Sequence, residues 1–422
     1  MKIAFYTLGC KVNQYETQSL REEFVKRGHT AVSHCNDFDC IIVNSCTVTA
    51  ESDRKTRQLL NRFRRENPKA LIVLTGCMAQ VLKKTDNVNA DIIVGNTNPL
   101  KLVELVEKGE NITQIDPHTR DEIFNTPLIS DFAERTRANL KIQDGCERYC
   151  TYCIIPFARG FVRSKPLKDI KEEAYSLALK GFKEIVLVGI NLSAYGKGEN
   201  INLCDAVDAV CSVDGIERVR LGSLEPDHIS NEMLTRFRKQ DKFCPQFHLS
   251  LQSGSNGVLK RMNRHYDSYF YEDLVNRIRE FFPDSAISTD IMVGFPQETA
   301  AEFEESLNFA KKIGFAKTHV FAYSRRKGTI ADKMEGQIEK LVKSERSRKM
   351  IKVALENESN FLNSLVGKTL DVLFETEEDN TWVGYTKNYA RVEVISGDNL
   401  SGSLKKVRIL SALGDTCQGE LI

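Results

Sequence analysis

Six of the twelve cysteines fall into two groups whose spacing can hold iron and sulfur. Three lie on one short loop, GCERYCTYC, as Cys146, Cys150 and Cys153. Three such thiolates can bind three irons of a [4Fe–4S] cluster and leave the remaining iron without a protein ligand. Zinc is the alternative, but it favours four tetrahedral ligands, and no further Cys or His stands nearby at zinc-motif spacing. The loop therefore predicts an iron–sulfur cluster with one open iron.

The second group is spread along the chain. Cys10, Cys46 and Cys77 each follow a short apolar run, in TLGCKVNQYE, NSCTVTAES and LTGCMAQ. If these runs are parallel strands, their carboxyl ends meet at one edge of the sheet, and the three thiolates can converge there. Isolated cysteines at strand ends are more often buried packing residues. From the residues alone, ligation and packing both stay open.

The other cysteines predict no chemistry, because most sit in apolar or helical contexts. Cys40 precedes Cys46 by six residues but should lie at the opposite end of its strand; the rest are Cys35, Cys204, Cys211, Cys244 and Cys417. No apolar run reaches the roughly 18 residues of a membrane span, and no secretory signal is present, so we expect a cytoplasmic protein. Cytosolic thiols stay reduced, which favours ligation over disulfides. The net charge of +1 gives no overall attraction to nucleic acid.

The elements that must position these thiols belong to an α/β protein of several units. Residues 1–110 alternate apolar strands with amphipathic helices, which predicts a doubly wound parallel-sheet domain. Residues 111–137 are polar and read as a linker. Residues 138–336 hold six further strands separated by helices, which predicts a partial (β/α)6 barrel that works at the carboxyl ends of its strands. A connecting helix is expected over 337–366, and a small antiparallel β-barrel over 367–422.

The CxxxCxxC motif after the first strand of a βα barrel resembles the signature of the radical-SAM superfamily. The resemblance implies that the open iron binds the amino and carboxylate groups of S-adenosylmethionine. One electron from the cluster would then cleave the sulfonium to a 5′-deoxyadenosyl radical. Tyr152, before the last cysteine, resembles the residue that lies against the adenine; the alternative is a plain packing aromatic.

From end to end the chain resembles the methylthiotransferase family. Further landmarks are IIPFARG, FVRSK, LGSLEP, HLSLQSG, MNRHY, DIMVGFPQET and AYSRRKGT. This resemblance implies an N-terminal cluster domain, a radical-SAM domain and a C-terminal TRAM domain. It also implies two [4Fe–4S] clusters, with the sulfur to be methylated held at Cys10, Cys46 and Cys77. Arg325 departs from the pattern, because several relatives have proline there.

Candidate positions for the cofactor are Gly189, Glu225, Gln252 and Arg264. A glycine permits close backbone approach, and an arginine can fork onto the methionyl carboxylate. Each is equally compatible with a structural turn or a surface ion pair. No catalytic residue is expected beyond the cluster ligands.

Local charge gives a partial guide to the substrate. The stretch RKTRQLLNRFRR has six basic residues and no acid, which suits tRNA phosphates and makes Arg54, Arg57 and Arg62 candidate contacts, although a solvated helix face is the alternative. The small barrel has six basic and nine acidic residues from Gly367 onward, which fits a basic protein partner better. Two alternatives therefore stand: methylthiolation of a ribosomal-protein aspartate, and a non-catalytic Fe–S protein that binds RNA.

The stretch TLGCKVNQYETQ resembles the subgroup that acts on N6-threonylcarbamoyladenosine beside the tRNA anticodon. That nucleoside carries a carboxylate, and Lys11 would stand next to the cluster where the base enters. Lys11 is therefore a candidate substrate contact, and the alternative is that it points to solvent. Other expected partners are tRNA and an electron donor of flavodoxin or ferredoxin type, and we expect a monomer.

Overall fold

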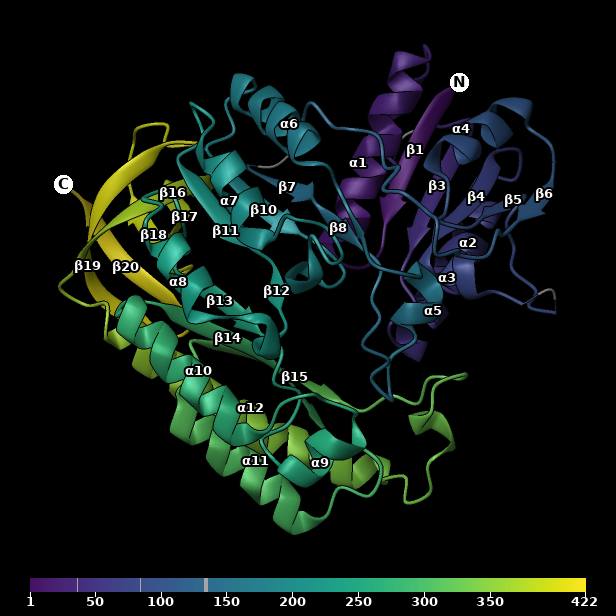
Figure 1. The fold of residues 1–422 in the computed structure, drawn as a ribbon. Helices are drawn as coiled ribbons and strands as arrows, with labels where there is room; N and C mark the ends of the chain where they lie inside the picture. The colour runs from purple at the N-terminus through teal and green to yellow at the C-terminus, as the bar shows by residue number, and fades with distance from the viewer. Residues whose placement is uncertain (36, 84, 133–135) are drawn as a thin grey trace.

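The N-terminal part is a parallel sheet with the strand order β2-β1-β3-β4-β5-β6 in a computed structural model that describes residues 1–35, 37–83, 85–132 and 136–422 (Figure 1). Its strands are β1 (Lys2–Thr7), β2 (Thr30–Val32), β3 (Cys40–Ser45), β4 (Leu71–Gly76), β5 (Ile92–Val94) and β6 (Ile112–Gln114). Every residue of β3 is buried, as expected for a strand covered on both faces. The prediction of a doubly wound parallel sheet is confirmed.

Helices cover both faces of this sheet. Apolar residues of α1 (Lys11–Lys26) and α4 (Pro99–Lys108) pack on one face, and those of α2 (Ala50–Glu66) pack on the other. Local sequence sets the helix ends: the Asn98 side chain caps α4, proline follows it, and Gly109 ends the helix in the left-handed region. The short helix α3 (Cys77–Val81) follows β4 directly.

Strand β6 lies inside 111–137, the range that the sequence assigns to a linker. It pairs with β5 in parallel, and Ile112 packs against the apolar core of the sheet. The sheet therefore gains an edge strand before the chain leaves it. Residues 133–135, within the same range, lie outside the described residues.

The central part is an open parallel barrel made of two adjoining sheets, β11-β10-β7 and β12-β13-β14-β15. One strand expected from RVRLGS is divided at Gly222 into β11 (Arg218–Leu221) and β12 (Ser223–Leu224), and this break passes the barrel wall from one sheet to the other. The predicted partial (β/α)6 barrel is confirmed. Its remaining strands are β7 (Arg137–Lys141), β10 (Glu184–Val188), β13 (Gln246–Leu249), β14 (Ala286–Val293) and β15 (Lys317–Ala322).

The two faces of the barrel wall differ in polarity. Outward residues such as Ile185, Leu221 and Phe247 join the main apolar core with the surrounding helices. Those helices are α6 (Leu167–Leu179), α7 (Leu203–Cys211), α8 (Asn231–Arg238), α10 (Ser268–Phe281) and α11 (Ala300–Ile313). The alternate residues face inward and are largely polar, so the barrel interior can receive a polar ligand.

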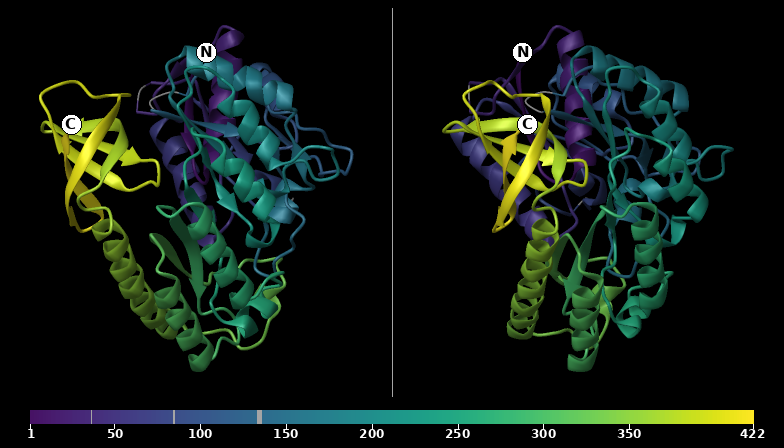
Figure 2. Two further views of the ribbon diagram at one scale, coloured as in Figure 1. Left: turned by 60° about the vertical axis from the view of Figure 1, so that its left-hand side comes forward. Right: turned by 90° about the vertical axis from the view of Figure 1, so that its left-hand side faces the viewer.

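The C-terminal part is a closed barrel with the strand order β16-β17-β18-β20-β19. It is joined to the rest by the long helix α12 (Lys340–Asn363) and appears in yellow in Figure 2. Its strands are β16 (Thr369–Glu378), β17 (Thr381–Thr386), β18 (Arg391–Ile395), β19 (Leu404–Leu413) and β20 (Thr416–Leu421). The expected small antiparallel barrel is confirmed, with one departure: β18 and β20 are parallel. Strand β19 pairs with β16 and forms a hairpin with β20. Strand β20 therefore lies between β19 and β18 and closes the barrel.

Helix α1 is shared between the first two parts of the chain. Its apolar residues Leu20 and Phe24 belong to the N-terminal core, whereas Tyr15 packs in the core of the central barrel. Polar contacts add to this packing: Asn139 Nδ2 donates to Gln14 Oε1 at 3.2 Å, and Lys141 Nζ donates to Glu16 Oε1 at 2.7 Å. One helix thus fixes the N-terminal sheet against the open side of the barrel.

Buried arginines join the central and C-terminal barrels. Arg218 donates to the carbonyl oxygens of Asp371 and Tyr385 at 2.7 and 2.8 Å, and Arg220 donates to that of Lys387 at 2.9 Å. Glu184 faces both guanidinium groups, with Arg220 Nε at 2.7 Å. Burial alone raises the pKa of Glu184, but Arg220, Arg137 and Arg218 together outweigh it and hold that pKa below its ordinary value. Glu184 therefore supplies counter-charge to both arginines.

We predict that Glu184→Gln lowers the thermal unfolding midpoint, because it leaves buried guanidinium groups without their counter-charge. Removing one partner of a buried pair costs about 3–5 kcal/mol. The control is Asp273→Asn, which removes the exposed partner of Arg277 and should change the midpoint far less. Calorimetry of both variants tests this, and equal midpoints would contradict it.

None of the described helices combines the length and the apolar character that crossing a bilayer requires.

Candidate active site

The loops that carry Cys10, Cys46 and Cys77 meet at the carboxyl edge of the N-terminal sheet. Cys10 caps α1 after β1, Cys46 follows β3, and Cys77 opens α3 after β4. Gly9 has a φ of +116°, and a Cβ added there would lie 2.9 Å from the Cβ of Cys46. The close approach of these two loops therefore requires glycine at this position.

Asn13 ties the same loops together from the first turn of α1. Its Nδ2 donates to the carbonyl oxygens of Leu8 and Ser45, each at 3.0 Å. Its Oδ1 accepts from Arg159 Nη2 at 2.9 Å and lies 3.5 Å from the Cys10 thiol. One buried amide thus fixes the ends of β1 and β3 next to each other.

Arg159 reaches this edge from the central part of the chain. It ends α5 (Ile155–Arg159), which begins shortly after Cys153 and packs against α3 (Figure 1). Its guanidinium is fully buried, pairs with Glu16, and donates from Nε to Cys77 Sγ at 3.0 Å. Burial raises the pKa of Cys77 to about 12, and the charge of Arg159 opposes that rise. A buried cation is therefore in place to stabilise a thiolate.

The loop with Cys146, Cys150 and Cys153 follows β7 and the short strand β8 (Gln143–Asp144). The Cys153 amide donates to the Cys150 carbonyl oxygen at 2.9 Å, which makes a tight turn. Arg264 Nη1 donates to Cys150 Sγ at 3.2 Å. Burial raises the pKa of Cys146 to about 11 and also raises that of Cys153. Each cysteine group therefore includes a sulfur that accepts from a buried arginine.

The spacing of the thiols fits a cluster better than a single ion. Among the described residues, one group of His, Cys, Asp or Glu side chains has three ligand atoms all within 4.8 Å of one another, and none of the six cysteines belongs to it. Thiolates on one zinc ion lie about 2.3 Å from it and hence less than about 4.6 Å apart. In a cluster each thiolate binds a different iron, so wider spacing is expected.

Three of the residues expected at the cofactor lie close together beside Cys150. Arg264 pairs with Glu225, and the charges of Arg264 and Cys150 both act on Tyr152. Arg264 also donates to the Ser250 carbonyl oxygen at 3.1 Å, so its donors are already engaged within the protein. Tyr152 packs against the small apolar cluster around Phe295 and Tyr323, as a packing aromatic would.

Arg148 has open donors in the same place, which sequence reasoning missed. Its Nη1 donates to Asp227 at 2.7 Å, but its Nε and Nη2 are buried without a hydrogen-bond partner in the described residues. Buried unsatisfied donors are rare and indicate a group that enters the site. Nη2 lies 3.7 Å from the Glu225 carboxylate, beyond hydrogen-bond distance, so both donors can bind a further acceptor.

The structure gives Gly189 and Gln252 structural roles. A Cβ at Gly189 would lie 2.8 Å from Gln143 Oε1, so close packing explains the glycine. Gln252 has a φ of +70°, and its amide donates to the Asp290 carbonyl oxygen at 2.9 Å. Contact of either residue with the cofactor stays a prediction.

The basic face of α2 is partly neutralised. Arg54 pairs with Glu51 and Arg62 with Glu66, which flank the acid-free stretch. Arg57 donates to the Asn87 carbonyl oxygen at 2.6 Å. Arg54 and Arg62 are nevertheless exposed, so they can exchange these carboxylates for phosphates.

Arg326, in YSRRKGT, supports the loop that carries Cys46. Its guanidinium donates to the hydroxyl of Thr47, the residue that follows Cys46, and pairs with Asp53 at 2.5 Å. Arg325, the departure from the family pattern, is exposed and pairs with Asp332 at 3.0 Å. Sequence reasoning assigned no role to Arg326, because its partners lie far away in the chain.

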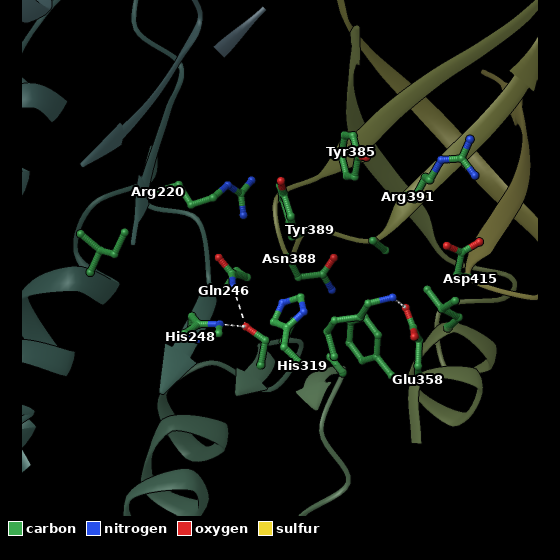
Figure 3. A pocket seen from close by; sticks show the side chains of 18 of the residues that line it. Arg220, Gln246, His248, His319, Glu358, Tyr385, Asn388, Tyr389, Arg391 and Asp415 are labelled. Atoms are coloured by element: carbon green, nitrogen blue, oxygen red, sulfur yellow. Dashed lines mark hydrogen bonds and ion pairs between the residues drawn. The ribbon is translucent and has the colours of Figure 1, made fainter. Parts of the chain in front are cut away.

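A cavity of about 480 Å³ lies between the barrel interior and the C-terminal barrel (Figure 3). Lys11 and Arg220 line it from one side, and Asn388 and Tyr389 from the other. Lys11 is exposed, yet desolvation by the surrounding protein and the nearby charges of Arg137 and Arg220 lower the pKa of its amine to about 8. No carboxylate among the described residues lies within salt-bridge distance of its amine. This end of the cavity therefore has an excess of positive charge.

Comparison with known proteins identifies the family. The chain matches the Uncharacterized protein family UPF0004 over residues 2–96 and the Radical SAM superfamily over residues 140–310. It is 36% identical to the threonylcarbamoyladenosine tRNA methylthiotransferase MtaB of Bacillus subtilis (strain 168), over 97% of this chain and 94% of that protein. The chain belongs to the methylthiotransferase family of radical-SAM enzymes. Enzymes of this family use S-adenosylmethionine and [4Fe–4S] clusters, and the six cysteines described above would hold two of them.

Other members of the family are similar over comparable lengths. The MtaB protein of Aquifex aeolicus (strain VF5) is 38% identical over 93% of this chain and 96% of its own. The tRNA-2-methylthio-N(6)-dimethylallyladenosine synthase of Clostridium botulinum (strain Loch Maree / Type A3) is 34% identical over 99% and 96%. The radical S-adenosylmethionine methyltransferase TsrM from Kitasatospora setae shares the fold, with a TM-score of 0.59 at 13% identity over 78% of this chain and 77% of that one.

We predict that Arg159→Lys makes the reduction potential of the N-terminal cluster more negative. A lysine keeps the charge but cannot span Cys77, Asn13 and Glu16 as the planar guanidinium does. The lost hydrogen bond to sulfur would no longer stabilise the more negative, reduced cluster. An EPR-monitored redox titration measures this after Cys146, Cys150 and Cys153 are changed to Ala, so that one cluster remains.

The matched control is Arg163→Lys, because Arg163 bonds the carbonyl oxygen of Arg159 at 3.1 Å but donates to no cysteine. The reduction potential of the N-terminal cluster in Arg163→Lys should match that of the parent protein. Equal potentials in both variants would show that the contact with Cys77 has no electronic effect.

Proposed function

We propose that this protein transfers a methylthio group to N6-threonylcarbamoyladenosine beside the anticodon of tRNA. Family membership and the names of the MtaB relatives support the reaction. The observation that carries it is the pair of cysteine groups in one chain, joined by Arg159, which extends from the loop of Cys153 to the thiol of Cys77. A radical-SAM enzyme that transfers sulfur needs both groups, because one supports cofactor cleavage and the other holds sulfur.

The cofactors, when bound, supply the radical chemistry that replaces an unactivated C–H bond by C–S–CH3. The protein holds them and excludes water. Cys146, Cys150 and Cys153 would hold the cluster that binds S-adenosylmethionine, with Arg148 offering donors to its carboxylate. Cys10, Cys46 and Cys77 would hold the second cluster against the open side of the barrel, where Val12 packs on Val186 and Val188 of β10.

Lys11 supports the choice of nucleoside. It follows Cys10 and lines the cavity with Arg220. The threonylcarbamoyl group carries a carboxylate, and the dimethylallyl group of the related substrate carries none. An unpaired cation at this place favours the anionic substrate through a charge-assisted hydrogen bond. Sequence identity is 36% to an MtaB relative and 34% to a dimethylallyladenosine synthase, so identity alone distinguishes the two substrates weakly. A variant of Lys11 therefore gives the sharper test of which nucleoside is the substrate.

Partners follow from this reaction. The exposed Arg54 and Arg62 of α2 are proposed to contact tRNA phosphates, with Arg57 alongside them. A flavodoxin or ferredoxin would supply the electron, and the chain would work in the cytoplasm as a monomer.

We predict that changing Cys146, Cys150 and Cys153 to Ala leaves about four irons per chain, half of the full content, and abolishes cleavage of S-adenosylmethionine. Changing Cys10, Cys46 and Cys77 should instead preserve cleavage and stop methylthiolation. Iron analysis and chromatography of 5′-deoxyadenosine measure both variants. Full iron content after either change would contradict two separate clusters, and absence of 5′-deoxyadenosine from the intact, reduced protein would exclude catalysis.

We predict that Lys11→Gln lowers kcat/KM on threonylcarbamoylated tRNA by about 10- to 100-fold, the worth of one hydrogen bond to a charged group. Formation of 5′-deoxyadenosine without RNA should change little. Lys26→Gln is the control, because Lys26 is exposed at the other end of α1. Mass spectrometry of the digested tRNA measures the product, and equal rates for both variants would remove Lys11 from recognition.

A further inference from the structure

Two histidines that line the cavity and one aspartate beside them lie on three neighbouring strands. They are His248 on β13, Asp290 on β14 and His319 on β15. Asp290 lies opposite His319 in the pairing of β14 with β15, and His248 lies opposite Ser288 in the pairing of β13 with β14. Since alternate residues of a strand share a face, Ser288 and Asp290 both point inward. The sheet register therefore brings all three side chains to one place.

Their ligand atoms converge. One nitrogen from each histidine and one carboxylate oxygen of Asp290 all lie within 4.8 Å of one another. His248 Nε2 is 3.2 Å from Asp290 Oδ2. Donors on one zinc ion, at about 2.0–2.2 Å each, stand up to about 4 Å apart. Small side-chain rotations are enough to bring the three to a common ion.

A second set of contacts orients the ring of His248. Its Nδ1 lies 3.2 Å from Ser288 Oγ, which in turn accepts from Gln246 Nε2 at 2.9 Å. Figure 3 shows His248 beside Gln246, with His319 further into the cavity. A hydrogen bond at one ring nitrogen fixes the other toward a metal, as in many histidine sites. Nε2 of His248 then points at Asp290. Either the ring's own proton or a bound cation must lie between this nitrogen and the carboxylate oxygen.

We propose that His248, Asp290 and His319 bind a divalent transition-metal ion such as zinc. The remaining coordination positions of the ion would be open to the cavity. Two imidazoles and one carboxylate are a ligand set that suits zinc and related ions. The open positions would accept an oxygen donor from water or from a ligand in the cavity. This site contains no cysteine, so it is separate from both clusters, and it shares its cavity with Lys11, which the proposed function assigns to the substrate.

The test uses the full chain with both clusters reconstituted and zinc added alone. We expect one zinc per chain by mass spectrometry, with iron content unchanged. Zinc K-edge absorption should show nitrogen and oxygen neighbours at about 2.0–2.1 Å, because zinc that had replaced cluster iron would show sulfur at about 2.3 Å. Absence of bound zinc, or a first shell dominated by sulfur, would overturn the proposal.

Variants identify the ligands. His319→Ala and the near-isosteric Asp290→Asn should each weaken zinc binding by more than about 100-fold, beyond the effect of changes outside the ligand shell. His265→Ala is the control, since His265 is exposed and lies outside the group of three. Near-equal zinc affinity in His319→Ala, Asp290→Asn and the control would overturn the assignment.

Discussion

The buried guanidinium of Arg159 is the interaction on which the arrangement of the two cysteine groups depends. It contacts four polar groups at once: the thiol of Cys77, the amide of Asn13, and the carboxylates of Glu16 and Asp144. A buried charge is tolerated only when it is paired and hydrogen-bonded, so each neighbour has to be in place for the others to be stable. Arg159 belongs to the segment after Cys153, whereas Asn13, Glu16 and Cys77 belong to helices α1 and α3 of the N-terminal part. The relative position of the two cysteine loops is therefore set by charge pairing as well as by packing.

The same physics shapes the interior of the central barrel. Glu184 balances Arg218 and Arg220, and the fully buried Lys165 pairs with the fully buried Glu173. Glu184, Arg218 and Arg220 sit on inward-facing strand positions, Glu173 belongs to α6, and the outward strand positions hold the apolar core. The apolar core outside the strands holds the barrel wall in shape, and the ionic side chains on its inner face keep the interior polar. That combination leaves a cavity in which charge is distributed unevenly, with cations near Lys11 and the His–Asp–His group on the opposite strands.

The sequence predicts those features whose causes are local. Alternating apolar runs and amphipathic helices predict the N-terminal parallel sheet and the central parallel barrel, and the cysteines at strand ends could be placed because parallel strands end at one edge. Arg159 could not be assigned from sequence, because its partner Cys77 is more than eighty residues away in the chain. The edge strand β6 was taken for linker because Ile112–Gln114 is too short to show a period. The polar alternation of Gln246 with His248, and of Ser288 with Asp290, was visible in the sequence, but an inward face could be recognised only once the register was known.

Helix α1 gives the molecule a limited modularity. The N-terminal sheet and the radical-SAM barrel match two different family descriptions, as if they were separable units. Yet one side of α1 completes the first core while Tyr15, Gln14 and Glu16 complete the second. An exchange of either unit between relatives would have to carry the matching face of α1 with it. Recombination within this family is therefore expected to fail where it divides the two faces of α1 between different relatives.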